Sequence, residues 1–343
     1  MKEIVNLALI GAGLWGKKHL EVYKKHPRAN VVAICDINEE RAKVLAKQYS
    51  ISHSYGDVKT MLKKHPEIEG VAIVTPDHLH RAPALEALHA GKHILVEKPL
   101  ASNLEDAEAI VKAAESSGCK LMVEFNSRWA LPFFHLKQSV SQGEIGTPIH
   151  GFARFSSRIS IPTEMLSWAD HSSALLFVGC LMIDVARWIL EDEVKRVYAV
   201  SREKVLWNMG VKTPDFFQSI LEFQKGTVLV LENSWVLPKG VPQAWDVRFE
   251  LVGTKGGYKL DLKQHGAITK YTSDGIEYPE IFAHGNIMDE AIGSVDRCIR
   301  SFVDCIISDS EPIANGYDGL AVNRVIDAIY KSINNGKPID IQE

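Results

Sequence analysis

The sequence has few cysteines, no dense basic segment and no apolar run long enough to cross a membrane. Its five cysteines are odd in number, stand far apart and form no CxxC pair. This usage argues against a disulfide framework or a cysteine zinc site, and it is typical of a reducing cytoplasm. The formal net charge of −4 argues against nucleic acid or an anionic membrane surface as the main partner.

No segment is typical of a secretory signal or a membrane span. The longest uninterrupted apolar stretch, ALLFVGCLMI in residues 174–183, falls well short of the roughly 20 residues that cross a bilayer. The first residues place Glu3 and Asn6 around a short apolar run, so they predict a strand and no signal peptide. We therefore expect a cytoplasmic protein that has no membrane partner.

The chain of 343 residues is too long for one ordinary hydrophobic core, so two domains are expected. Its first third alternates short apolar runs with helical patterns, which is typical of a parallel sheet covered on both faces. The predicted strands are Val5–Ile10, Val31–Cys35, Gly70–Val74, Ile94–Val96 and Leu121–Glu124. The predicted helices begin near Leu14 or span Glu39–Gln48, Ala82–Ala90 and Leu104–Ser117.

After about Phe125 the pattern changes to strands that alternate apolar and polar residues, with few helices between them. This change predicts an antiparallel sheet with one covered face, and it divides the chain into domains 1–124 and 125–343. The predicted strands are Ile149–Ser157, Val197–Ser201, Phe216–Phe223, Thr227–Trp235, Val247–Val252 and Tyr258–Leu262. The predicted helices are Ala174–Leu190 and Ala321–Asn334.

A glycine-rich turn follows the first predicted strand. Gly11, Gly13 and Gly16 stand in GxGxxG spacing directly before a helix, the context that gives this weak pattern meaning. Such glycines permit a tight turn, the approach of a pyrophosphate to the backbone, and close packing of helix and strand. Asp36 ends the second strand, where a carboxylate can bind ribose hydroxyls and repels a 2′-phosphate. The pattern predicts an NAD site and disfavours NADP.

The fourth predicted strand ends in VEKPL, which places Lys98 between an acid and a proline. Ligands of open α/β sheets bind at this carboxyl edge. A lysine there can position a hydroxyl and help to move its proton, whereas the plain alternative is a surface lysine in a turn.

These motifs resemble those of the Gfo/Idh/MocA family, named for glucose–fructose oxidoreductase and inositol dehydrogenase. The matching segments span essentially the whole chain and include GAGLWGKKH, VVAICD, VAIVTPDHLH, GKHILVEKPLA, EFNSRW, GEIGTP, GCLMIDVARW and ELVGTKGG. The resemblance implies an α/β fold: an N-terminal Rossmann doubly wound parallel sheet, then a C-terminal α+β domain with an open, mostly antiparallel sheet. It also implies a nicotinamide cofactor, a polyhydroxylated substrate, and a homodimer or homotetramer formed through the C-terminal sheet.

The resemblance carries cofactor-binding roles onto the matching positions of this chain. These positions are Gly11, Gly13, Leu14, Trp15, Gly16, Asp36, Thr75, Pro76, His78, Glu97, Lys98, Asn126 and Arg128. His78 and His80 could suggest a metal pair, but they stand two apart in a loop that the family uses for NAD, so no metal site is predicted.

One helix departs from the family pattern. Family members usually read Asp-x-Gly-x-His-x-x-Asp here, with the histidine as acid/base group, whereas this chain has Phe177 and Leu181 at the first Asp and the His positions. Asp170 and His171 precede the helix and are candidates for the proton-transfer role together with Lys98, because histidine titrates in a useful range. The alternative is that Asp170 or Ser172 is a solvated helix cap.

We expect an NAD-dependent oxidoreductase that transfers a hydride between nicotinamide and a hydroxyl or carbonyl of a sugar, cyclitol or sugar derivative. Two alternatives stay open: a lyase or glycosidase that uses bound NAD as a shuttle, and a non-catalytic NAD sensor, which the missing Asp and His would suit. Side chains that could shape the substrate site are Arg154, Arg158, Trp168, Trp235, Trp245 and His284.

Overall fold

The computed structural model describes residues 3–241, 243–262, 270–272, 275–277, 286–287 and 290–342. The chain divides into two units. Unit 1 comprises Met1–Trp129 and Phe282–Asn323, and unit 2 comprises Ala130–Ile281 and Arg324–Glu343. The first crossing between the units lies close to the expected boundary at residue 124, but the chain also returns to unit 1 near its end.

Unit 1 contains a six-stranded sheet in the order β3-β2-β1-β4-β5-β6, and every neighbouring pair is parallel. This is the doubly wound arrangement that the alternating pattern predicted. The strands are β1 (Val5–Ile10), β2 (Ala29–Cys35), β3 (His53–Tyr55), β4 (Gly70–Ile73), β5 (His93–Val96) and β6 (Leu121–Val123). The sequence analysis missed β3, because this edge strand reads HSY and contains no apolar run.

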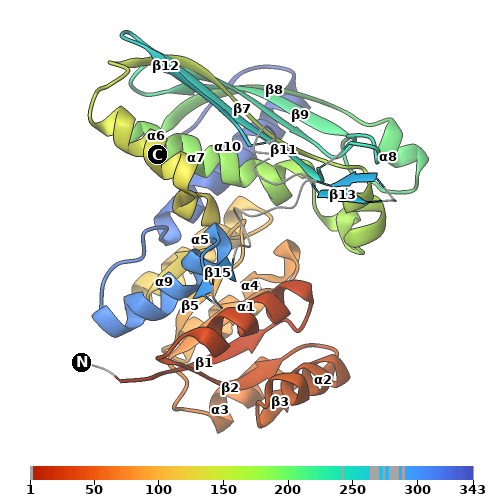
Figure 1. Ribbon diagram of the computed structural model, residues 1–343, viewed down its shortest axis with the longest axis vertical. Helices are drawn as coiled ribbons and strands as arrows, with labels where there is room; N and C mark the ends of the chain where they lie inside the picture. The colour runs from red at the N-terminus through yellow and green to blue at the C-terminus, as the bar shows by residue number, and fades with distance from the viewer. Residues whose placement is uncertain are drawn as a thin grey trace. The chain divides into compact units, whose positions relative to one another are not determined.

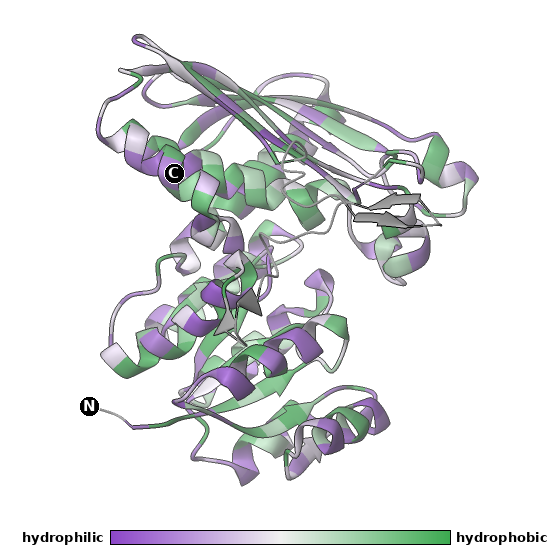
Figure 2. Cartoon of the chain, in the orientation of Figure 1, coloured by the Kyte–Doolittle hydropathy of each residue, from purple (hydrophilic) through white to green (hydrophobic). Residues whose placement is uncertain are grey.

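Helices connect these strands and cover the sheet (Figure 1). They are α1 (Leu14–Lys25), α2 (Glu39–Tyr49), α3 (Val58–Lys64), α4 (Arg81–His89) and α5 (Leu104–Ser117). Local chemistry sets the ends of α5: the Asn103 side chain accepts the Asp106 N–H, and Gly118 takes a left-handed conformation, as is usual at helix ends. In Figure 2, β1 and β2 are largely green, whereas α1 and α2 carry both green and purple surfaces.

The return of the chain to unit 1 adds helix α9 (Ser294–Ser308). Its apolar face belongs to the same buried cluster as Leu7 and Leu9 of β1. Gly70 makes the close approach possible, because a Cβ there would lie 2.9 Å from Ile306 and 3.1 Å from Phe302. The core of unit 1 is therefore completed by residues 294–308, and a single domain boundary in the sequence could not predict this return of the chain.

Unit 2 contains a seven-stranded sheet in the order β12-β11-β7-β10-β9-β8-β17. All neighbours are antiparallel except β7 and β10, so the expected mostly antiparallel sheet is confirmed. The strands are β7 (Pro148–Ser157), β8 (Val194–Arg202), β9 (Phe216–Phe223), β10 (Val228–Ser234), β11 (Trp245–Gly253), β12 (Gly257–Asp261) and β17 (Ile339–Asp340). In unit 2, β13 (Lys270–Thr272) pairs with β14 (Gly275–Glu277), and in unit 1, β15 (Asn286–Ile287) pairs with β16 (Glu290–Ala291).

Four α-helices accompany this part of the chain. They are α6 (Leu131–Ser141), α7 (Cys180–Leu190), α8 (Val205–Asn208) and α10 (Gly316–Asn335), of which the last begins in unit 1. The expected helix 174–190 starts as a π-helical turn, η5 (Leu175–Gly179), and continues as α7. Both segments pack against β7 in the interior of unit 2.

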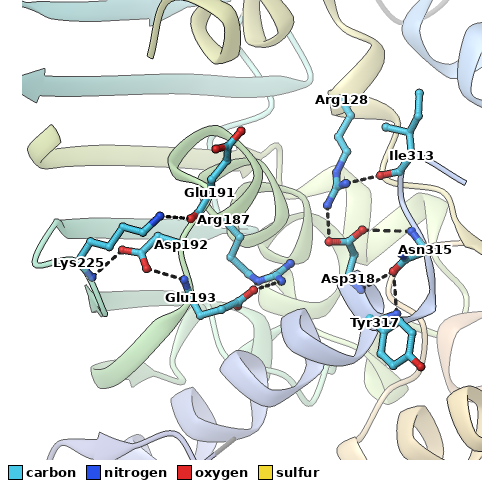
Figure 3. A network of polar contacts seen from close by, with 10 residues as sticks. All are labelled: Arg128, Arg187, Glu191, Asp192, Glu193, Lys225, Ile313, Asn315, Tyr317 and Asp318. Carbon is cyan, nitrogen blue, oxygen red and sulfur yellow. Dashed lines mark hydrogen bonds and ion pairs between the residues drawn. The ribbon is translucent and has the colours of Figure 1, made fainter. Parts of the chain in front are cut away.

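Polar contacts fix the turn between α7 and β8 (Figure 3). The Arg187 guanidinium pairs with the Glu193 carboxylate, and the two Asp192 oxygens accept the N–H groups of Glu193 and Lys225. These contacts satisfy backbone groups that the turn would otherwise leave unpaired. Within the part of the chain that the structure describes, no helix has the length and apolar character of a membrane span.

The packing of α9 into the core of unit 1 predicts a loss of stability when a buried side chain of this helix is removed. Phe302 is fully buried, so Phe302→Ala should lower the free energy of unfolding by about 3–5 kcal/mol through lost burial and a residual cavity. Urea denaturation followed by fluorescence measures the change. Ile313→Ala is the control, because that side chain is 56% exposed; equal losses in the two variants would show that α9 is not part of this core.

Candidate functional site

The glycine turn after β1 has the geometry of a phosphate cradle. Gly11 adopts a φ of 107°, which only glycine tolerates readily, and its N–H donates to the Cys35 carbonyl at 2.8 Å. A Cβ at Gly16 would lie 2.0 Å from the Gly11 carbonyl oxygen, whereas a Cβ at Gly13 would meet no described atom within 4 Å. The turn is therefore closed where helix meets strand and open where a pyrophosphate would approach the N-terminus of α1.

Asp36 ends β2 beside this turn, and its carboxylate is held in place. One oxygen accepts the Ala12 N–H at 2.7 Å and the other accepts the Asn38 N–H at 2.8 Å. Each carboxylate oxygen has a second lone pair, so both can still accept a ribose hydroxyl. These residues fit the adenosine half of NAD.

Two large apolar side chains stand exposed at this site. Leu14, a predicted cofactor residue, is 79% exposed, and Ile37 is 95% exposed. Ile37 was missed by sequence reasoning. The available signal in the sequence was the place of Ile37 directly after Asp36, the acid predicted to bind the ribose.

The loops after β4 and β5 lie at the same edge of the sheet as the glycine turn, because β1, β4 and β5 are adjacent and parallel. The Thr75 hydroxyl is buried and has no hydrogen-bond partner among the described residues, which suits a residue that awaits a ligand group. Pro76 precedes the short helix η1 (Asp77–Leu79), in which the His78 N–H donates to the Asp77 carboxylate at 2.7 Å. Thr75, Pro76 and His78 are thus placed at the predicted edge.

His80 ties these two loops together. One ring nitrogen lies 2.9 Å from the Pro99 carbonyl oxygen and the other lies 3.0 Å from the Thr75 carbonyl oxygen. Burial lowers the pKa of His80, while the charge of Asp77 acts in the opposite direction. Both ring nitrogens of His80 thus face backbone carbonyl oxygens, and the expectation that His78 and His80 hold no metal stays a prediction.

Lys98 follows β5 at this edge and is half-buried. Its backbone N–H donates to a Glu97 carboxylate oxygen at 3.1 Å, and the Lys98–Pro99 peptide bond is cis. The lysine therefore sits at the carboxyl end of the strand adjacent to β4, where ligands of such sheets bind.

Beneath Lys98 lies a buried cluster that sequence reasoning missed. His19 Nε2 is 2.9 Å from Glu124 Oε2 and 3.9 Å from Glu97 Oε1. Burial alone would lower the pKa of His19, but the charges of Glu124 and Glu97 and hydrogen bonds to them raise it to about 9. Burial and the Glu97 charge raise the pKa of Glu124 to about 8. The only signal was the presence of ionisable residues at positions that face an apolar core.

Glu97 behaves differently from Glu124. Burial acts to raise its pKa, but the hydrogen bond with His19 and the charge of Lys98 hold it below the ordinary value of a glutamate. The directions of the pKa shifts therefore favour the charged forms of His19 and Glu97 and the protonated form of Glu124.

Arg128 and Asn126 lie in the short helix η2 (Asn126–Trp129). The Arg128 guanidinium is buried, donates to the Ile313 carbonyl at 2.5 Å and pairs with the Asp318 carboxylate at 2.9 Å (Figure 3). Asp318 in turn accepts the Asn315 N–H. These contacts give Arg128 a structural role at the start of α10, while its cofactor role and that of Asn126 stay predictions.

The helix that departs from the family pattern is apolar in unit 2, as its sequence indicated. The Phe177 ring packs among Trp168, Trp235 and Trp245, with ring centroids at 6.0, 5.9 and 6.2 Å. Leu181 is buried. Aromatic contacts thus surround Phe177, at the position where family members carry a carboxylate.

Asp170 and His171 are exposed in the short helix η4 (Ala169–His171). One Asp170 oxygen accepts the Lys212 N–H at 2.6 Å, so this carboxylate fastens a neighbouring loop. The helix cap is a different residue from the two expected, because the Ser173 hydroxyl accepts the Leu176 N–H at 3.2 Å. The catalytic roles of Asp170 and His171 stay predictions.

The residues expected to shape a substrate site have mixed surroundings. The Arg154 guanidinium pairs with Glu232 at 2.6 Å and with Asp246 at 3.4 Å, and Trp235 is completely buried. Arg158, Trp168 and Trp245 are partly exposed. His284 lies outside the described residues.

Comparisons with known proteins agree with this geometry. A model of the oxidoreductase family with an NAD-binding Rossmann fold matches residues 5–125, and a model of the GFO/IDH/MocA C-terminal domain matches residues 133–259. The chain is 28% identical to scyllo-inositol 2-dehydrogenase (NAD(+)) of Bacillus subtilis, over 99% of this chain and 97% of that protein.

Two further relatives extend the comparison. The chain is 26% identical to D-apiose dehydrogenase of Paraburkholderia graminis, over 98% of this chain and 89% of the relative. The fold matches that of scyllo-inositol dehydrogenase from Lactobacillus casei with bound NAD(H) and scyllo-inositol, with a TM-score of 0.83, 21% identity, and coverage of 98% and 99% of the two chains.

The geometry of Asp36 predicts a change in coenzyme affinity. Asp36→Ala removes two acceptors for ribose hydroxyls, so we expect NAD to bind about 10- to 100-fold more weakly, the equivalent of one or two charged hydrogen bonds. The preference over NADP should shrink as well. Calorimetric titration with both coenzymes measures these changes, with Asp309→Asn, an exposed carboxylate after α9, as the control; unaltered NAD affinity in Asp36→Ala would contradict the assignment.

Proposed function

Because the chain belongs to the Gfo/Idh/MocA family of NAD-binding oxidoreductases, we propose that it transfers a hydride between NAD and a hydroxyl or carbonyl carbon of a sugar, cyclitol or sugar derivative. The observation that carries the proposal is the position of Lys98 at the carboxyl edge of the sheet that also holds the glycine turn. The names of the relatives support the substrate class, because they include inositol and apiose dehydrogenases.

The residues of unit 1 have different roles in the proposed reaction. When bound, NAD supplies the hydride-accepting ring. Asp36 binds the adenosine ribose, and the open side of the glycine turn admits the pyrophosphate. Lys98 presents a compact ammonium charge that binds the reacting hydroxyl and stabilises its oxygen as the proton leaves. The His80 ring contacts the backbone carbonyls of Thr75 and Pro99 and so holds the loop after β4 next to the loop that carries Lys98.

The proton that leaves the hydroxyl needs an acceptor, and the helix position of the family histidine is Leu181. As an ammonium, Lys98 has no lone pair to take this proton, so we propose that Lys98 orients the hydroxyl and that His171 and Asp170 are the candidate acceptors. The side chain of His171 is exposed to solvent. In this scheme a water molecule or the substrate itself carries the proton onward.

We also propose that the protein is a homodimer or homotetramer formed through the sheet of unit 2. One face of this sheet carries a row of apolar side chains across four paired strands: Tyr198 opposite Ile220, Ile220 opposite Val230, and Val230 opposite Phe152. Tyr198, Ile220 and Val230 are each about two-fifths exposed. An apolar row of this kind on a sheet face is typical of a surface that another protein covers.

Substitution of Lys98 tests the proposed chemistry. Lys98→Met should lower kcat by about 10²- to 10⁴-fold, because it removes the group that orients the hydroxyl as its proton leaves, and it should leave NAD affinity within a few-fold. NADH formation from a panel of inositols and sugars gives kcat, and calorimetry gives the coenzyme affinity. Lys112→Met, on the exposed side of α5, is the matched control, and unchanged turnover in Lys98→Met would defeat the role.

The proposed assembly is tested on the apolar row. Combining Ile220→Glu with Val230→Lys should convert the oligomer to a monomer, because it places charges in the centre of the buried patch. Analytical ultracentrifugation gives the mass, and circular dichroism checks the fold. Val205→Glu on α8, a side chain of similar exposure, should leave the mass unaltered; a monomeric wild-type protein would refute the proposal.

A further inference from the structure

The cluster of His19, Glu97 and Glu124 combines three elements of unit 1 in a place that water hardly reaches. His19 and Glu124 are completely buried, and Glu97 is 8% exposed. His19 comes from α1, the helix that opens the coenzyme site, whereas Glu97 and Glu124 follow β5 and β6. The cluster therefore lies between the coenzyme-binding helix and the turn that carries Lys98.

Both ring nitrogens of His19 have polar partners. Its Nε2 contacts the Glu124 carboxyl at 2.9 Å and its Nδ1 lies 3.4 Å from the Tyr23 hydroxyl. A neutral ring would donate to Glu124 and accept from the Tyr23 hydroxyl, whereas a charged ring donates at both nitrogens. The carboxyl groups on one side supply the negative charge that such a ring needs in a buried place.

The two carboxyl groups cannot both be ionised without cost. Two carboxylates beside one imidazolium would leave a net negative charge in the core, which is unfavourable at low dielectric. In addition, one oxygen of Glu97 and one of Glu124 are buried without a hydrogen-bond partner among the described residues, and a carboxyl oxygen of each lies within 4.8 Å of the other and of a His19 ring nitrogen. One proton between them removes both problems, because it makes one group a donor and the other its acceptor.

The surroundings decide which carboxyl group keeps the proton. The other charged and titratable groups that interact with the cluster are Tyr23 of α1, His80 after β4, and Lys98 after Glu97. The positive charge of Lys98 acts on Glu97 and favours its ionised form. The proton therefore resides on Glu124, and the ionised Glu97 is free to accept the Lys98 backbone N–H.

We propose that Glu97 and Glu124 share one proton beside a charged His19, and that this cluster positions the turn bearing Lys98. The hydrogen bonds run from His19 to Glu124, from protonated Glu124 to Glu97, and from the Lys98 N–H to Glu97. His19 and Glu124 are positioning residues, because they act on the reaction only through Glu97. The positioning role rests on the proposed function of Lys98, whereas the shared proton does not depend on it.

The first measurement detects the proton itself. Infrared spectroscopy of the holoenzyme should show the carbonyl band of a buried, protonated carboxyl group near neutral pH, and Glu124→Gln should remove it. Absence of the band in the wild-type protein would overturn the proposal. A stoichiometric metal ion in the purified enzyme that is lost in Glu124→Gln would also overturn it, because the three side chains would then be ligands instead of proton partners.

The second measurement separates positioning from bulk stability. A glutamine at position 124 can accept from His19 and donate to Glu97 as the protonated acid does, so Glu124→Gln should keep kcat within about 3-fold. Glu124→Leu can do neither and should lower kcat by about 10- to 100-fold, the scale of a small misplacement of a reacting group, with NAD affinity nearly unchanged. Equal kcat losses in the two variants, or none in Glu124→Leu, would overturn the positioning role.

The third measurement follows stability against pH. The folded-state pKa values of Glu124 and His19, about 8 and about 9, lie above their ordinary values, so the folded state binds more protons and loses stability as pH rises through this range. Urea denaturation should show this loss in the wild-type protein and a smaller loss in Glu124→Gln; identical slopes would overturn the shared proton. If Lys98→Met leaves turnover unchanged while the infrared band persists, the proposed role of Lys98 and the positioning role fail, but the shared proton stands.

Discussion

The close approach of α1 to the turn after β1 is the constraint on which the nucleotide-binding unit depends. Gly16 faces the Gly11 carbonyl at a distance that no side chain allows, and Gly11 takes a backbone conformation that suits glycine. This contact aims the first turn of α1 at the open side of the loop. It also sets the depth at which His19, one helical turn further on, enters the core beside Glu97 and Glu124.

The turn after β1 and helix α1 therefore connect the predicted coenzyme site with the His19 cluster below Lys98. Asp36 and the glycine turn, the predicted binding groups for the adenosine side, lie at the ends of β2 and β1, while Thr75, His80 and Lys98 occupy the next two strand ends. The chain keeps this edge polar and well hydrogen-bonded, although its Phe177 helix has exchanged carboxylate and histidine for hydrocarbon. We infer that the essential chemistry is concentrated on the lysine edge, with substrate recognition left to other groups.

The sequence allowed prediction where local chemistry dominates. The limits of β1, α5 and β9 are those expected, because apolar runs, an asparagine cap and a closing glycine define them. The fold class and NAD were also predicted correctly. The strand β3 was missed since its residues are polar, and α9 was missed as a part of unit 1 since its partner strands lie more than 200 residues earlier. The His19 cluster has no motif, because only tertiary packing shows that these ionisable side chains meet.

The return of α9 to the nucleotide-binding unit has a consequence for biosynthesis. Six core side chains of that unit, from Val295 to Ile306, leave the ribosome only after residues 130–294 have been translated. A nascent chain of the first 129 residues would expose the apolar surface of β1 and β4 that α9 covers. Domains commonly fold as they emerge during synthesis. Here the core of unit 1 is incomplete until α9 has been translated, so unit 1 should depend on chaperones more than unit 2 does.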